Sequence, residues 1–275
     1  MKRTLCLIVY VCLVLTSCSL GPQPEPIRKV AQVYCDDVDN PFINLETYLE
    51  REFRGHLNVI ADPVYATKRN VLKRPLKGYM SHKIWTTTHV ARALALKAVP
   101  AIKKELTRIN VPQKIIQRVV IIVKDGYRPY RASRELFLWG EPLGFAKEGY
   151  VAAGVSGHNL GMSVDLTLGY RSNDGTIKEI WMGATFDEFS KNSHNNLAGQ
   201  YPQDFLDTDW ENLQTLATDG RYYILDNVDL NELRDSLRLG MDVAGFSSYY
   251  KEYWHFSYRD HLKIYGDICY DRPIQ

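Results

Sequence analysis

Near its middle the chain reads Ser156-Gly157-His158-Asn159-Leu160-Gly161-Met162-Ser163-Val164-Asp165. A histidine lies in a turn bounded by glycines, and an aspartate seven residues later enters a run of alternating apolar residues that predicts a strand. Histidine and aspartate are both side chains that zinc accepts as ligands. A His-x6-Asp pair alone often occurs by chance, so it indicates a metal site only with support from elsewhere in the chain.

That support comes from Glu252-Tyr253-Trp254-His255 near the C-terminus, where a second histidine follows a carboxylate by three residues. Together, His158, Asp165 and His255 would supply three protein ligands and leave the fourth tetrahedral position open, as in catalytic zinc sites. Glu252 would remain free to act as a base. A lone histidine beside tryptophan is usually a packing residue, so the prediction depends on both segments.

Arg128 is a further candidate for the site. It follows the apolar run at residues 119–123, which predicts a buried strand that ends in the turn Asp125-Gly126-Tyr127-Arg128-Pro129. Functional side chains often lie on loops that a rigid scaffold positions. We therefore expect a fixed, functional guanidinium here, with a structural ion pair as the alternative.

Motifs in a fixed order extend from about residue 57 to about residue 260. They are Tyr65-Ala66-Thr67 with Asn70, Asp125-Gly126-Tyr127-Arg128-Pro129 with Arg131-Ala132, Ser156-x-His158-x-x-Gly161-x-x-x-Asp165-Leu166-Thr167-Leu168, Met182-Gly183-x-x-Phe186-Asp187, and Glu252-x-Trp254-His255. This series resembles the D-alanyl-D-alanine dipeptidases, a family of zinc peptidases. Related D,D-carboxypeptidases and cell-wall endopeptidases share the metal motifs, whereas Asp-Gly-Tyr-Arg-Pro and Met-Gly-x-x-Phe-Asp are similar to the dipeptidase branch.

The resemblance implies one zinc ion held by His158, Asp165 and His255. It implies that Glu252 is the general base and then acid, and that Arg128 stabilises the tetrahedral intermediate. Family members also hold both ends of a free dipeptide. The matching residues are Tyr65, Asp165 and Asp187 near the ammonium, and Ser156 and Tyr79 near the carboxylate.

The chain departs from the family pattern at two places. Tyr253 replaces the usual tryptophan, at a position that needs an aromatic ring and performs no chemistry. The segment at residues 73–79 matches only at Pro75 and Gly78-Tyr79, so the assignment of Tyr79 depends on the least similar part of the pattern.

The implied reaction is hydrolysis of free D-Ala-D-Ala in the cell envelope. One alternative is a zinc D,D-carboxypeptidase or endopeptidase that trims peptidoglycan stem peptides. Another is a cell-wall-binding lipoprotein that has kept the fold and lost catalysis. The presence of both Glu252 and Arg128 argues against the inactive alternative, because a binding protein needs no base.

Helical and strand patterns alternate without a regular β-α-β rhythm, which predicts an α+β domain with a mainly antiparallel central sheet flanked by helices. The resemblance implies the same fold, that of D,D-peptidases and hedgehog-like zinc peptidases. The predicted helices cover residues 82–109, with a kink or break at Pro100, and residues 130–139 and 230–245; the predicted strands cover residues 119–123, 164–168 and 177–182.

Glu252 and His255 pose a geometric problem, because residues three apart face opposite sides of an ideal strand. If both serve one site, the strand must bend or begin between them. We then expect Trp254 to pack into the core as the pivot.

The N-terminus predicts export. Met1-Lys2-Arg3 and the short apolar run at residues 5–15 are typical of a signal peptide, and Leu15-Thr16-Ser17-Cys18 resembles a bacterial lipobox. We expect a signal peptide at 1–17, a lipidated Cys18 with a Pro-rich tether at 18–32, and a catalytic domain at 33–275. Ser19 favours an outer-membrane anchor facing the periplasm, and an ordinary secretory signal is the alternative.

Removal of the signal peptide changes the charge and the cysteine count. The total of Lys and Arg falls from 34 to 32, equal to the 32 acidic residues, so nucleic acid is an unsuitable partner. Cys35 and Cys269 become the only two free cysteines of the mature domain. An even pair in an exported protein indicates a disulfide, with two reduced cysteines as the alternative.

Overall fold

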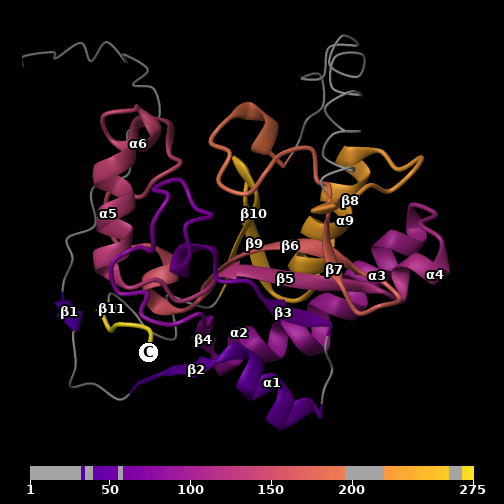
Figure 1. Ribbon diagram of the computed structural model, residues 1–275, viewed down its shortest axis with the longest axis horizontal. Coiled ribbons are helices and arrows are strands. Elements are labelled where there is room, and N and C mark those ends of the chain that lie inside the picture. The colour runs from indigo at the N-terminus through magenta and orange to yellow at the C-terminus, as the bar shows by residue number, and fades with distance from the viewer. Residues whose placement is uncertain (1–31, 35–39, 55–57, 196–219, 260–267) are drawn as a thin grey trace, which may run out of the picture.

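The computed structural model describes residues 32–34, 40–54, 58–195, 220–259 and 268–275 (Figure 1). The predicted signal peptide, Cys18 and nearly all of the tether lie outside these ranges. The described residues form a single domain of mixed helices and strands, which confirms the α+β class. Within them, every helix is too short or too polar to cross a membrane.

In the described part of the chain, the main sheet has seven strands in the order β3-β5-β6-β10-β9, with β7 beside β6 and β8 beside β7. The strands are β3 (Val59–Ala61), β5 (Val119–Asp125), β6 (Ser163–Arg171), β7 (Ile177–Ile180), β8 (Tyr222–Tyr223), β9 (Phe246–Tyr249) and β10 (Glu252–Tyr258). The pairs β5–β6, β6–β10, β9–β10 and β6–β7 are antiparallel, whereas β3–β5 and β7–β8 are parallel. The sheet is therefore mixed.

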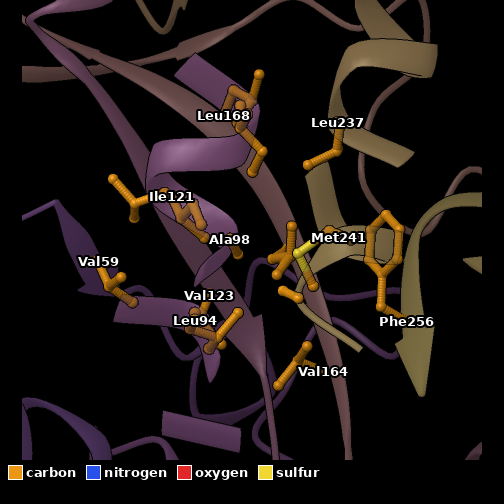
Figure 2. Packing of buried hydrophobic residues seen from close by; sticks show 14 of the residues in the cluster. Val59, Leu94, Ala98, Ile121, Val123, Val164, Leu168, Leu237, Met241 and Phe256 are labelled. Atoms are coloured by element: carbon orange, nitrogen blue, oxygen red, sulfur yellow. The ribbon is translucent and has the colours of Figure 1, made fainter. Parts of the chain in front are cut away.

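The helices α2 (Thr88–Ala93), α3 (Val99–Arg108) and α9 (Leu230–Val243) pack against one face of this sheet. Figure 2 shows the contact between them, where sheet and helix side chains interdigitate. The labelled side chains are Val59, Ile121, Val123, Val164, Leu168 and Phe256 from the strands, and Leu94, Ala98, Leu237 and Met241 from the helical side. Because this face is apolar, alternate residues such as Asp165 lie on the opposite face.

The helix expected at residues 82–109 begins later than its pattern suggests. Trp85–Thr87 is extended and forms β4, which pairs with β2 (Phe42–Asn44), so helical geometry starts at Thr88. A π-helical turn (Leu94–Ala98) then separates α2 from α3, and the Val99 N–H donates to the Leu94 carbonyl five residues earlier. The break therefore falls just before Pro100, in agreement with the prediction.

The remaining elements surround this core. They are α1 (Leu45–Phe53), α4 (Gln113–Ile116), α5 (Tyr130–Gly140), α6 (Phe145–Glu148), β1 (Gln32–Tyr34), β11 (Ile268–Tyr270) and the 3-10 turns Val64–Ala66, Gly157–Leu160 and Lys191–Ser193. β1, near the start of the domain, pairs in parallel with β11, near its end. In this pair Tyr34 lies beside Tyr270. Cys35 lies outside the described residues, so its bond to Cys269 stays a prediction.

Candidate active site

Three neighbouring strands carry a row of polar residues on the face that the helices leave free. Asp125 on β5 lies opposite Asp165 on β6, and Asp165 lies opposite His255 on β10. A bulge in β5 makes this row possible, because Val123 pairs with Leu166 and Asp125 with Asp165, so Lys124 is the extra residue. In unbroken register Lys124 would lie opposite Asp165 instead.

A second irregularity brings Glu252 and His255 to the same site. Against β9, Glu252 pairs with Tyr249 while Phe256 already pairs with Ser248, so β10 contains extra residues between these points. Trp254 is only 1% exposed and packs in the core between them. This confirms the expected bend, with Trp254 as its buried pivot.

The ligand atoms of His158, Asp165 and His255 form a compact triangle. His158 Nε2 lies 3.2 Å from His255 Nδ1 and 3.3 Å from Asp165 Oδ1, and His255 Nδ1 lies 3.0 Å from the same oxygen. A tetrahedron with zinc–ligand bonds of about 2.0–2.1 Å has edges of about 3.3 Å. The triangle therefore fits one face of a tetrahedral zinc site.

Neighbouring groups determine which atom each histidine presents. His158 Nδ1 lies 2.7 Å from the Gly126 carbonyl, an acceptor only, so Nδ1 donates and Nε2 keeps its lone pair. His255 Nε2 lies 3.3 Å from Ser257 Oγ, which leaves Nδ1 for the metal. Gly126 must be glycine here, because a Cβ would lie 2.4 Å from the Trp85 carbonyl oxygen.

The electrostatics favour an ionised Asp165 and a neutral His255. Burial by itself raises the pKa of the Asp165 carboxyl, but His158 and His255 outweigh it and hold that pKa below its usual value. Burial lowers the pKa of His255, although Asp165 opposes this shift. An ionised carboxylate and neutral imidazoles are the forms that bind zinc.

Arg128 lies beside the triangle and two carboxylates hold its guanidinium. Nε donates to Asp125 Oδ2 at 2.8 Å, and Nη2 donates to Asp165 Oδ2 at 3.0 Å. The guanidinium also lies over the Tyr65 ring, 4.7 Å from the ring centre. Arg128 is thus oriented by ion pairs, as in the structural alternative, and it also borders the cavity, where a functional guanidinium was expected.

Glu252 is a buried carboxyl group in the same cavity, with Oε2 3.9 Å from His255 Nδ1. Burial, together with the negative charges of Asp165 and Asp187, raises its pKa well above the usual value, and Arg128 offsets only part of this. A positive charge on the ligand triangle would lower that pKa again. The group is thereby suited to accept a proton and later return it.

Asp187 and Tyr65 lie together on another wall of the cavity. The Tyr65 hydroxyl donates to Asp187 Oδ1 at 2.8 Å, whereas Oδ2 is buried and has no hydrogen-bond partner among the described residues. Burial raises the pKa of Asp187 to about 7. Its backbone has a φ of 62°, in the left-handed region that non-glycine residues rarely adopt. A buried, unpaired carboxylate oxygen is suited to receive a cation.

The cavity has a volume of about 320 Å³, and most predicted site residues line it. They are Tyr65, Arg128, Ser156, His158, Asp165, Asp187, Glu252 and His255. Tyr79, in contrast, is not among the described side chains that line the cavity. It is buried, and its hydroxyl donates to Asp125 Oδ1 at 2.6 Å. Tyr79 therefore holds Asp125, the carboxylate that in turn holds Arg128.

Sequence reasoning assigned no role to Asp125, Tyr150 or Tyr249. Asp125 lies inside the Asp-Gly-Tyr-Arg-Pro motif, three residues before Arg128, but at a strand end this spacing does not by itself predict the ion pair that the structure shows. Tyr150 and Tyr249 line the cavity, although no local pattern marks them in the sequence. Their positions depend on loops that meet only in the folded chain.

Comparison with known proteins agrees with this geometry. A sequence model of the D-ala-D-ala dipeptidase family, peptidase family M15, matches residues 57–275. The chain is 28% identical over 247 residues to a D-alanyl-D-alanine dipeptidase of Enterococcus faecium, a match covering 83% of this chain and 98% of that protein. Proteins of the same name from Enterococcus faecalis and Streptomyces coelicolor are 26% and 28% identical, over 72% and 78% of this chain and 85% and 91% of theirs.

Proposed function

The chain belongs to the D-ala-D-ala dipeptidase family of M15 metallopeptidases, and we propose that it hydrolyses free D-Ala-D-Ala to D-alanine. One observation carries the proposal: a single cavity of about 320 Å³ holds both a zinc-type ligand triangle and a buried carboxylate with an unpaired oxygen, that of Asp187. The first would hold a metal that activates water for amide hydrolysis, and the second would recognise the free ammonium of a short substrate.

One zinc ion per chain would be held by His158, Asp165 and His255. When bound, it would supply a Lewis acid beside the scissile carbonyl and lower the pKa of a nearby water towards about 7. Glu252 takes a proton from the attacking water and delivers it to the nitrogen of the leaving D-alanine. The Arg128 guanidinium stabilises the negative charge that develops on the carbonyl oxygen.

The ends of the dipeptide would be bound by residues on different walls. Asp187, oriented by Tyr65, pairs with the ammonium, and Asp165 adds further negative charge on that side. Ser156, at the start of the Gly157–Leu160 turn, lines the cavity and would bind the carboxylate. Tyr79 was predicted to share that role; its bond to Asp125 instead supports a role in positioning Arg128.

The neighbouring activity is that of a D,D-carboxypeptidase or endopeptidase, whose stem-peptide substrates have an acylated amine where the free dipeptide has an ammonium. The unpaired oxygen of Asp187 argues against it, because an acyl group in that place would leave a buried carboxylate without a partner. Glu252 and Arg128 in the cavity argue against an inactive cell-wall-binding lipoprotein.

The N-terminal sequence supports an enzyme of the cell envelope. The lipobox-like Leu15-Thr16-Ser17-Cys18 favours lipidation of Cys18, and Ser19 favours an outer-membrane anchor that faces the periplasm. There the enzyme would meet dipeptides derived from the cell wall. Labelling with a radioactive fatty acid, compared between the natural chain and Cys18→Ala, tests this part of the proposal.

Product analysis tests the proposed activity. The zinc-loaded protein should hydrolyse free D-Ala-D-Ala and lose most of this activity on N-acetyl-D-Ala-D-Ala and on a pentapeptide stem. Asp187→Ala should reduce hydrolysis of the free dipeptide more than hydrolysis of the acetylated one, because only the free substrate loses an ion pair. Equal rates on free and blocked substrates would instead identify a carboxypeptidase.

A further inference from the structure

One wall of the cavity includes residues that also reach the solvent. The segment at residues 148–152, here called the lip, contributes Gly149, Tyr150, Val151 and Ala152 to the cavity lining. Gly149 and Ala152 are exposed to solvent, whereas Tyr150 and Val151 between them are buried. Other lining residues, such as Tyr65, Leu136 and Trp254, are buried in the core. A substrate longer than a dipeptide could extend out of the cavity past the lip.

Two side chains of the β9–β10 turn fasten this lip. The Tyr249 hydroxyl donates to the Gly149 carbonyl at 2.9 Å, and Lys251 Nζ donates to the Glu148 carbonyl. Lys251 Nζ also lies 5.3 Å from the centre of the Tyr150 ring, within range of a cation–π interaction. We call these contacts the clasp. They join the lip to the hairpin that carries Glu252 and His255.

Gly149 allows the clasp to form. Its φ is +86°, and a Cβ there would lie 2.8 Å from the Tyr249 hydroxyl, so a side chain would displace the donor. On the other edge of the lip, Tyr150 stacks on Phe189 with ring centres 5.4 Å apart, and its hydroxyl lies 3.1 Å from His194 Nε2. The lip is thus held on both sides. The clasp holds the side next to the β9–β10 hairpin, which carries Glu252 and His255.

We propose that the clasp determines substrate length, by holding the lip down so that the cavity accommodates a dipeptide and excludes longer peptides. The inference rests on the proposed dipeptidase activity and adds specificity-determining residues to it. Tyr249 on β9 pairs with Glu252 on β10, so a residue that fastens the lip lies beside the proposed base. Loosening the clasp releases the lip from the β9–β10 hairpin and leaves the ligand triangle intact.

The test compares free D-Ala-D-Ala with tri-D-alanine, which keeps its ammonium. Lys251→Met removes the bond to the Glu148 carbonyl, and Tyr249→Phe removes the bond to the Gly149 carbonyl. Each change should raise the ratio of kcat/KM for tripeptide over dipeptide about fivefold, and both together more, because a hydrogen bond of ordinary strength shifts an equilibrium by about this factor. Product analysis then identifies which end of the tripeptide extends past the lip.

Lys147→Met and Tyr250→Phe are the matched controls. They make the same chemical changes beside the lip and in the turn, at exposed residues that do not line the cavity and make no clasp hydrogen bond, and should leave the ratio unchanged. Thermal unfolding of every variant separates specificity from general loosening. An unchanged ratio in the double clasp variant, or an equal rise in the controls, overturns the proposal. A natural enzyme that does not hydrolyse D-Ala-D-Ala refutes the dipeptidase assignment instead.

Discussion

Asp165 belongs to two parts of the site at once. Its Oδ1 faces both histidines, and its Oδ2 accepts a hydrogen bond from Arg128. One carboxylate therefore connects the ligand triangle with the guanidinium that is proposed to stabilise the developing oxyanion. Glu252, in contrast, is near the triangle without completing it, and burial keeps its pKa raised. These surroundings give the two carboxyl groups different chemistry.

This difference predicts opposite results for two substitutions. His255→Ala removes one of three ligands, so the protein should lose its zinc together with its activity. Glu252→Gln should keep about one zinc per chain and lose at least about a hundredfold in kcat, because only the proton carrier is removed. Metal analysis of purified protein beside a dipeptidase assay measures both quantities. Full zinc occupancy in His255→Ala, or normal turnover in Glu252→Gln, would contradict these assignments.

Two strand irregularities build the site. The Lys124 bulge in β5 moves Asp125 into line with Asp165, and the irregularity in β10 brings Glu252 and His255 to one side. Lys124 itself is buried, and its ammonium pairs with Asp62 at 2.8 Å and with Glu179. The extra residue of the bulge is thus stabilised by two carboxylates away from the cavity, since an unpaired buried charge would be costly.

The bulge gives Asp125 a positioning role that can be tested. Asp125→Asn removes the charge that holds Arg128 Nε, so kcat should fall about tenfold to a hundredfold, with zinc content and KM changed much less. Asp271→Asn is the control, because it removes a carboxylate that holds the neighbouring Arg131 outside the cavity. Steady-state kinetics and zinc analysis of both variants provide the measurement. A purely structural Asp125 would instead lower the unfolding temperature and leave kcat near normal.

The two ends of the domain lie side by side in the fold. β1 and β11 form a parallel pair remote in sequence, in which Val33 lies opposite Cys269. The last residues also contact the interior, because the Tyr127 hydroxyl donates to the Arg272 carbonyl at 2.9 Å and Ile274 is fully buried. The C-terminal segment is therefore bonded to the turn that follows β5 and carries Arg128.

A disulfide between Cys35 and Cys269 is expected to lock this closure. The bond would close a loop of more than two hundred residues, which the chain-entropy model values at up to about 5 kcal/mol. Exported protein should show no free thiol in these two cysteines before reduction, and reduction should lower its unfolding temperature. Mass analysis of alkylated, non-reduced protein decides the matter, and two alkylated cysteines would refute the bond.

Chemistry and element type could be read directly from the residues. The alternation around Asp165 predicted β6, the apolar run at 119–123 predicted β5, and the spacing of Leu233, Leu237 and Met241 predicted α9, because side-chain periodicity reflects which face is buried. The ligand types and their motifs likewise identified His158, Asp165 and His255 before any geometry was known.

Other features arise only when distant segments meet. The bulges that align Asp125 with Asp165 depend on how two strands pair, and no residue of β5 alone reveals that register. The late start of α2 at Thr88 depends on the partner that β2 offers to β4. Tyr249 and Gly149 are 100 residues apart, so their bond exists only in the folded chain. Local sequence thus determined ligand chemistry and periodicity, whereas strand register and loop contacts decided the alignment and closure of the cavity, because both are non-local.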